Sequence, residues 1–130
     1  MCALPSDHPL AARDEVPLQA LQNEDFVLFP RSFSPAYYDK IVAMCVRAGF
    51  TPQIRHEVRH MLSIATLVGR KFGVSLVPAS LQTIALPNLS FRPLAQPEQP
   101  AELHAIWREG DPSALVHALL AQLSEATPEI

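Results

Sequence analysis

Proline punctuates this chain along its whole length, and its spacing limits what the chain can fold into. There are 13 prolines in 130 residues, against only 4 glycines. A proline breaks the interior of a helix and restricts the residue before it to extended backbone. The sequence therefore predicts many short elements ending in stiff turns, and it disfavours long uninterrupted helices. The length suits one domain and is too small for two ordinary ones.

Composition excludes several classes of protein. Hydrophobic residues make up 48% and charged residues 18% of the chain, which is typical of a globular fold and not of a disordered one. The net charge of -3 argues against nucleic-acid binding by this part alone, because phosphates need a basic face. No apolar run approaches the roughly 20 residues of a transmembrane helix, and no secretory signal is present. We therefore expect a cytoplasmic protein with no membrane contact.

Apolar residues alternate between the spacing of strands and the spacing of helices. Strand-like runs occur at residues 2–5, 26–29, 53–58, 74–77, 89–94 and 103–108. Helical spacing occurs at residues 35–49, 60–71 and 113–123. Strands that alternate with helices in this way indicate βαβ units, an α/β fold and a mostly parallel sheet.

The loop after the strand at 26–29 is the first place to look for a ligand. Ligands of such sheets bind at the carboxyl ends of the strands, where helix N-termini favour a carboxylate. Ser34 is expected to cap the following helix, either as a cap only or as a cap that also touches ligand. Arg31 has two readings as well, a bidentate partner of a ligand carboxylate or a solvated surface arginine.

No motif of catalysis, metal binding or cofactor binding accompanies this loop. The sequence lacks GxSxG, HExxH and a glycine-rich phosphate loop. The histidines are scattered without metal-ligand spacing, and Cys2 and Cys45 form no CxxC pair. The two cysteines are expected to be small buried hydrophobes. We expect no enzyme, no metal and no cofactor.

The order of several short segments resembles the LysR-type transcriptional regulators. These segments are residues 3–11 (ALPSDHPLA), 26–31 (FVLFPR), 48–52 (AGFTP), 68–69 (VG), 73–80 (GVSLVPAS), 91–94 (FRPL), 105–108 (AIWR) and 111–115 (DPSAL). Residues 69–71 depart from the small residues that the family usually has there, and their charges are expected to form a solvated helix end. The details look most like the subgroup that senses benzoate or muconate.

This resemblance implies a truncated periplasmic-binding-protein-like domain with three αβα layers. Residues 6–93 would form lobe II of the effector domain, and residues 102–130 the returning strand and helix of an incomplete lobe I. Residues 1–5 and 94–101 would be the hinge segments between the lobes.

In the family the effector lies between the two lobes, so the resemblance also implies site residues. The predicted effector-binding set is Arg31, Ser32, Phe33, Ser34, Pro35, Tyr37 and Met61. The family usually has phenylalanine where this chain has Tyr37, so the phenol is expected to alter ligand preference.

The implied partners are a small effector, such as an aromatic carboxylate, and further copies of the chain in a dimer or larger oligomer. DNA would be contacted only through an N-terminal domain that these residues do not include. Two alternatives stay open, a stand-alone small-molecule-binding lobe and an association module, neither with a DNA role.

Overall fold

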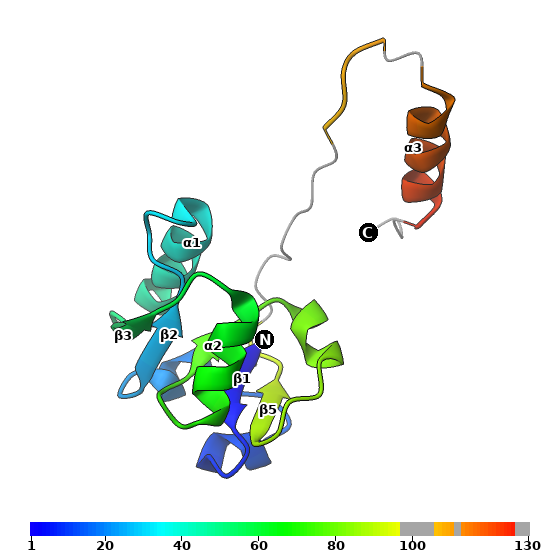
Figure 1. Ribbon diagram of the computed structural model, residues 1–130. Helices are drawn as coiled ribbons and strands as arrows, with labels where there is room; N and C mark the ends of the chain where they lie inside the picture. Colours follow the sequence, from blue (N-terminus) through cyan, green and yellow to red (C-terminus); the bar gives the residue numbers. More distant parts are fainter. Residues whose placement is uncertain (97–105, 111–112, 127–130) are drawn as a thin grey trace. The chain divides into compact units, whose positions relative to one another are not determined.

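The computed structural model describes residues 1–96, 106–110 and 113–126. The chain divides between Gln99 and Pro100 into two compact units. The first contains all the strands of the described residues (Figure 1). They are β1 (Cys2–Pro5), β2 (Asp25–Leu28), β3 (Gln53–Glu57), β4 (Ser75–Leu76) and β5 (Leu89–Arg92). Its helices are α1 (Pro35–Arg47), α2 (Met61–Gly69) and the 3-10 helices η1 (Pro9–Ala12), η2 (Leu18–Leu21) and η3 (Ala79–Thr83).

The strands lie in the order β3-β2-β4-β1-β5. β2 pairs with β3 in parallel, and a parallel bridge between Phe26 and Val74 joins β2 to the start of β4. β1 pairs antiparallel with β4 on one side and with β5 on the other. Four strands therefore run in one direction, and β1 alone runs against them. The predicted α/β fold is confirmed, and parallel pairing holds between β2 and β3 and at the bridge to β4, whereas both pairings of β1 are antiparallel.

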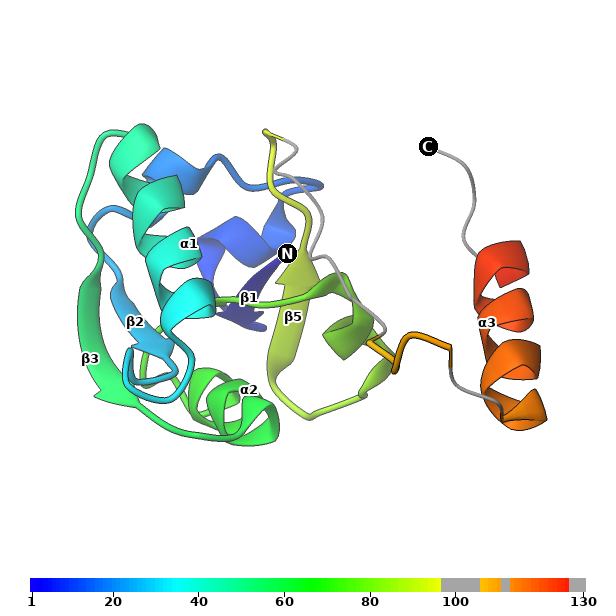
Figure 2. The ribbon, with the colours of Figure 1, turned by 90° about the horizontal axis from the view of Figure 1, so that it is seen from above.

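Helices cover both faces of this sheet, which gives the three expected layers (Figures 1 and 2). Alternate residues of a strand point to opposite faces. Cys2, Leu4 and Phe26 accordingly pack in a cluster with α1, whereas Ala3 and Val27 pack in a second cluster with α2.

The helices begin and end close to where the sequence predicts. α1 begins at Pro35, whose fixed φ suits the first helical position. It ends at Arg47, and Gly49 follows with a φ of 93°. α2 begins one residue later than predicted and ends at Gly69, two residues before Lys71 adopts a φ of 66°.

One predicted strand differs from the structure, and one predicted hinge segment is also a strand. The strand predicted at residues 103–108 is wrong for its described part, because residues 106–108 form no strand, and residues 103–105 lie outside the described residues. A strand needs a hydrogen-bonded neighbour, and α3 (Ala114–Ala126) is the one element described in this second unit. Residues 1–5, predicted as hinge, supply β1, the buried strand between β4 and β5.

The other hinge prediction concerns residues 94–101. Leu94 bridges Val16, and the Ala95 N–H donates to the Val16 carbonyl at 3.0 Å, so this end is attached to the first unit. The division between the units falls inside the predicted segment. A hinge role for residues 1–5 and 94–101 stays a prediction.

Candidate functional site

Three helices begin at one edge of the sheet. β2, β3 and β4 run in the same direction, so their carboxyl ends share this edge. The chain continues from β2 to α1 at Pro35, from β3 to α2 at Met61, and from β4 to η3 at Ala79. The N–H groups of a first helical turn have no partner within the helix. This edge therefore presents several backbone donors, and it includes the predicted site residues.

An aromatic cluster spans the loop between β2 and α1 and the first turn of α1. The Phe29 ring centroid is 5.7 Å from that of Phe33 and 5.5 Å from that of Tyr37. Phe33 is 52% exposed, whereas Phe29 and Tyr37 are partly buried. Sequence reasoning placed Phe29 in the strand and missed its place in this cluster. Its position as the last apolar residue before Pro30 was the available signal.

The phenol of Tyr37 is bonded within the protein. Its hydroxyl donates a hydrogen bond of 2.6 Å to the carbonyl of Leu76 at the end of β4. Burial raises the pKa of this phenol above its ordinary value. The sequence predicted that the hydroxyl would alter ligand preference. In the structure the hydroxyl attaches the first turn of α1 to the sheet.

Ser34 occupies the N-cap position of α1, as predicted, but its side chain does not cap the helix. Its backbone has φ -141° and ψ 77°, which departs from the extended conformation that directs a capping hydroxyl at the first turn. The prediction of a side-chain cap is therefore wrong. Pro35 adds no N–H at the helix start, and it is exposed.

Arg31 is paired with an acidic residue of α1. Its Nε lies 2.7 Å from Oδ1 of Asp39, and its second guanidinium nitrogen 2.9 Å from Oδ2. This bond to Arg31 lowers the pKa of the Asp39 carboxyl below its usual range. Both side chains are exposed, 65% and 51%. Arg31 thus matches neither reading fully, since it lies at the surface but already holds a carboxylate.

The remaining predicted residues lie at the same edge in different settings. Met61 is partly buried and packs against the cluster that includes Ile64 and Val77. Ser32 is exposed in the loop, two residues before Ser34. The structure thus places the whole predicted set on the loop before α1, on its first turn and at the start of α2.

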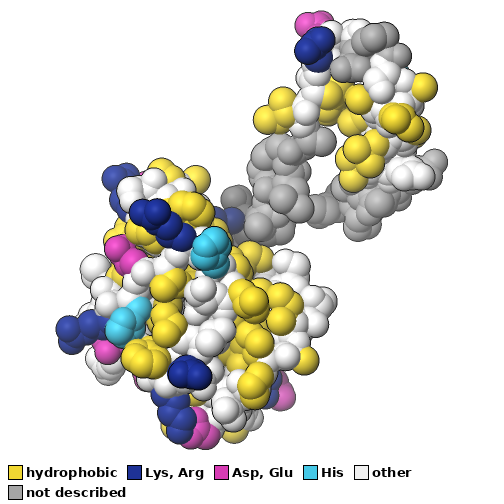
Figure 3. All heavy atoms as spheres, viewed as in Figure 1, with side chains coloured by type: hydrophobic (Ala, Val, Ile, Leu, Met, Phe, Trp, Pro, Cys, Tyr) yellow, Lys and Arg dark blue, Asp and Glu magenta, His cyan; other side chains and the backbone are white. Residues whose placement is uncertain are grey.

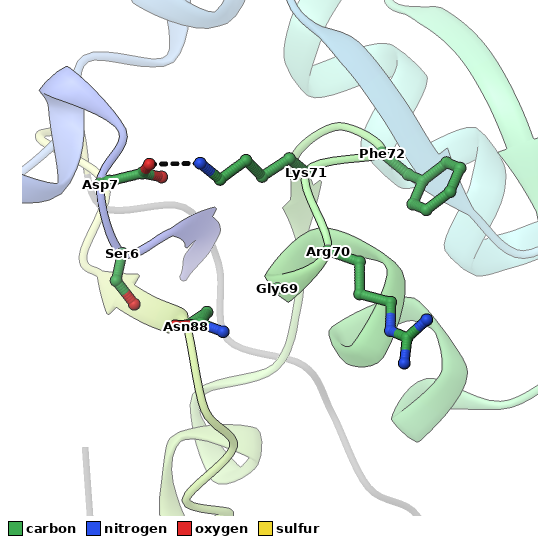
Figure 4. A pocket seen from close by; sticks show the side chains of 7 residues that line it. All are labelled: Ser6, Asp7, Gly69, Arg70, Lys71, Phe72 and Asn88. Carbon is green, nitrogen blue, oxygen red and sulfur yellow. Dashed lines mark hydrogen bonds and ion pairs between the residues drawn. The ribbon is translucent and has the colours of Figure 1, made fainter.

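A hollow of about 600 Å³ opens elsewhere in the first unit, and the sequence did not predict it (Figure 4). Its lining consists of Ser6, Asp7, Gly69, Arg70, Lys71, Phe72 and Asn88. These residues follow β1, end α2 and precede β5, so the hollow lies at the edge opposite to the three helix starts. The sequence predicted only a solvated helix end at residues 69–71, since nothing local shows that residues 6 and 88 lie beside them.

The cysteines and acidic residues offer no alternative centre. Cys2 and Cys45 are free and buried, and burial raises their pKa to about 12 and about 11. The prediction that they are buried hydrophobes is confirmed. Within residues 1–96, 106–110 and 113–126, no three His, Cys, Asp or Glu side chains are grouped to hold a metal ion. In that same part, no helix is long and apolar enough to cross a bilayer.

Comparison with known proteins gives one consistent result. The family model described as LysR substrate binding domain matches residues 1–128. The chain is 35% identical over 107 residues to the uncharacterized HTH-type transcriptional regulator YnfL of Escherichia coli, covering 82% of this chain and 36% of YnfL. It is 32% identical over 121 residues to the HTH-type transcriptional regulator BenM of Acinetobacter baylyi, covering 92% of this chain and 40% of BenM.

A solved structure agrees with this result. The BenM effector binding domain with its effector benzoate superposes with a TM-score of 0.71 and 29% identity, covering 98% of this chain and 62% of that domain. The periplasmic-binding-protein-like fold is thereby confirmed. The chain spans about two fifths of the length of the curated relatives it matches. Those relatives are transcriptional regulators, which confirms the prediction that the chain is not an enzyme. By the match along nearly its whole length, the chain belongs to the LysR substrate-binding domain family.

Proposed function

We propose that this chain is the effector-sensing portion of a LysR-type transcriptional regulator. It binds a small carboxylate, aromatic in character, at the edge where α1, α2 and η3 begin. The observation that carries this proposal is the arrangement of the edge itself. The three helices that follow β2, β3 and β4 all begin at this edge, beside the exposed ring of Phe33.

The chemistry of the edge suits an aromatic carboxylate. Unpartnered N–H groups and the positive end of a helix dipole favour a carboxylate. Phe33 and Phe29 offer a ring surface on which an aromatic group can lie. The similarity to a BenM domain that holds benzoate supports the same class of ligand, as does the benzoate- or muconate-like subgroup suggested by the sequence.

In the whole regulator a second lobe would supply the other wall of the cleft. The chain alone therefore binds effector more weakly than the complete protein does. Ligand closure would shift the arrangement of subunits in an oligomer, and DNA would be contacted through a separate N-terminal domain. The regulator would act in the cytoplasm without membrane contact.

The test is a nuclear magnetic resonance titration of the chain with benzoate. Benzoate should shift the backbone amides of Phe33, Ser34, Ala36 and Met61, and Phe33→Ala should weaken binding severalfold. Phe72→Ala is a matched control, because Phe72 is similarly exposed (47%) but lines the opposite edge. A parallel titration with cyclohexanecarboxylate, which has an apolar ring without an aromatic face, separates the contribution of ring stacking from that of apolar contact. The proposal fails if benzoate leaves these amides unmoved at saturating concentration.

The native size of the polypeptide separates this proposal from a stand-alone lobe. An antibody raised to this chain should detect a protein of about 33 kDa in source cells, the size expected for roughly 300 residues. A band at 14.3 kDa would instead favour a free-standing binding or association lobe with no DNA role.

A further inference from the structure

The hollow at the opposite edge contains an unusual backbone conformation. Within the described residues, Lys71 and Asn88 are the two non-glycine residues with positive φ, at 66° and 59°. Both line the hollow. Asparagine tolerates this conformation, but lysine does not adopt it readily.

Lys71 stands at a position where helices favour glycine. After α2, the Lys71 N–H donates to the Val68 carbonyl and the Phe72 N–H reaches back to the Leu67 carbonyl at 3.1 Å. This is the hydrogen-bond pattern of a helix end closed by a left-handed residue. A glycine here would close the helix without steric strain. The conformation therefore does not explain why the position carries a lysine.

The side chain of Lys71 reaches across the hollow. Its ammonium pairs with the carboxylate of Asp7, which follows β1 (Figure 4). This bond lowers the pKa of the Asp7 carboxyl. Both side chains are 64% exposed. An exposed ion pair is held weakly, so a ligand can open it.

Backbone contacts hold together the segments that line the hollow around this ion pair. The Ser6 N–H donates to the Asn88 carbonyl at 2.9 Å, which joins the end of β1 to the start of β5. A Cβ at Gly69 would lie 3.1 Å from the Pro87 carbonyl oxygen, so the absent side chain permits this close approach. The side chain of Arg70 points away from the ion pair in Figure 4.

We propose that this hollow binds a small zwitterion of the α-amino acid type. A ligand with only a carboxylate would pair with the ammonium of Lys71 but be repelled by the negative charge of Asp7. A ligand with only an ammonium group would pair with the carboxylate of Asp7 but be repelled by the positive charge of Lys71. A zwitterion replaces both partners of the ion pair, its carboxylate on Lys71 and its ammonium on Asp7. The hydroxyl of Ser6 and the amide of Asn88 add polar contacts on the same wall (Figure 4).

Titration of the chain with three small molecules tests the proposal. L-alanine should shift the backbone amides of Ser6, Asp7, Lys71 and Asn88. Acetate and ethylamine, which each carry one of the two charges, should shift them at least tenfold less at equal concentration. The proposal is overturned if L-alanine leaves these amides unmoved, or if acetate alone reproduces its effect.

Two variants make the test specific. Lys71→Gly removes the ammonium at a position where glycine is favoured, so the fold and the unfolding midpoint should be retained while binding of L-alanine is lost. Arg70→Ala removes the same charge from the neighbouring residue, and binding should remain. Retained binding in Lys71→Gly would overturn the proposal. The response to benzoate should be unchanged in both variants, so failure here is distinguishable from failure of the proposed effector site.

Discussion

The side chains of the loop before α1 and of its first turn are of two kinds, those already bonded to the protein and those that face solvent. Arg31 holds Asp39, and Tyr37 holds the carbonyl of Leu76. Phe33 is half exposed, and Ser34 does not use its side chain to cap α1. Ligand contacts at this loop are therefore expected from Phe33 and Ser34, whereas Tyr37 positions the helix that carries the free N–H groups.

Arg31→Ala should raise the pKa of Asp39 towards the ordinary value of a carboxyl group, because the hydrogen bond from the guanidinium is lost. The arginine lowers this pKa in the folded protein, so its contribution to stability is present above the unfolded pKa and is lost as pH falls through the lower folded value. Carbon-detected titration of the Asp39 carboxyl measures this. Arg55→Ala, which removes a partner of Asp25 instead, should leave the Asp39 pKa unchanged.

Tyr37→Phe should lower the free energy of unfolding by about 1–2 kcal/mol, because the partly buried carbonyl of Leu76 loses its donor. Denaturant unfolding measures the loss, and Tyr38→Phe on the same helix turn should change it by less than about 0.5 kcal/mol. The relative affinities for benzoate and hydroxybenzoates should be the same in Tyr37→Phe and wild type. A reversed ranking would show that the phenol contacts ligand.

The sequence could locate the loop between β2 and α1, which we propose binds effector, but not the partners of its side chains. Local order is visible in residues 26–35, where an apolar strand leads into a proline-started helix. The Tyr37 hydroxyl, by contrast, bonds a carbonyl 39 residues away, and Lys71 pairs with a residue 64 positions earlier. Such pairings depend on how strands are ordered in the sheet, which no local pattern carries.

At the scale of the elements, β2 and β4 are joined by a single bridge between Phe26 and Val74. The Val74 N–H donates to the Asp25 carbonyl at 2.8 Å, and the Val27 N–H donates to the Val74 carbonyl at 2.9 Å. Ser75 reinforces it, since its buried hydroxyl donates to the carbonyl of Val27 at 2.7 Å. Gly73 precedes this join with a φ of 145°.

Gly73→Ala should destabilise the fold by roughly 3 kcal/mol, the upper end of ordinary single substitutions. A Cβ at Gly73 would lie 2.3 Å from the Asp25 carbonyl oxygen, so it would separate β2 from β4. Gly49→Ala is the control, because its φ of 93° is strained as well but nothing lies within 4 Å of the added Cβ. It should cost only about 1–2 kcal/mol. Equal losses in thermal unfolding of the two variants would contradict this account.

Element positions followed from the sequence better than strand direction did. Strand and helix ends lie within a few residues of the predicted ones, because prolines and glycines mark them. The direction of β1 did not follow, since a four-residue apolar run carries no information about its neighbours. The prediction at residues 103–108 failed in its described part for a related reason. Alternating apolar residues predict a strand there, but a strand forms only where another segment supplies a hydrogen-bonded partner.

At the scale of the whole molecule, apolar surface remains on both units. Hydrophobic side chains gather over α2 and the segment after β4 (Figure 3), where Leu62 is 51% and Ile84 39% exposed. On α3, Leu115, Leu119 and Leu123 are 82%, 57% and 43% exposed. Their spacing of four places them along one side of the helix. Such a stripe is typical of a helix that packs against another element.

Self-association should therefore depend on α3. The mass of the chain in sedimentation should rise with concentration, and Leu119→Glu should reduce this rise by placing a charge in the stripe. Ala114→Glu, at the start of the same helix and off the stripe, is the matched control and should leave association unchanged. A mass that does not change with concentration would argue against an association role.

The place of β1 also determines the order in which the first unit can fold. Cys2 pairs with Leu76 on one side and with Arg92 on the other, so β1 pairs on both sides with segments that lie far along the chain. Folds dominated by such distant pairings form slowly, because long loops must close before any contact is gained. On the ribosome, β1 stays unpaired until β4 has emerged, and its other side stays unpaired until β5 follows. The first unit therefore completes its sheet late, and a nascent chain stopped before β5 leaves one side of β1 unpaired.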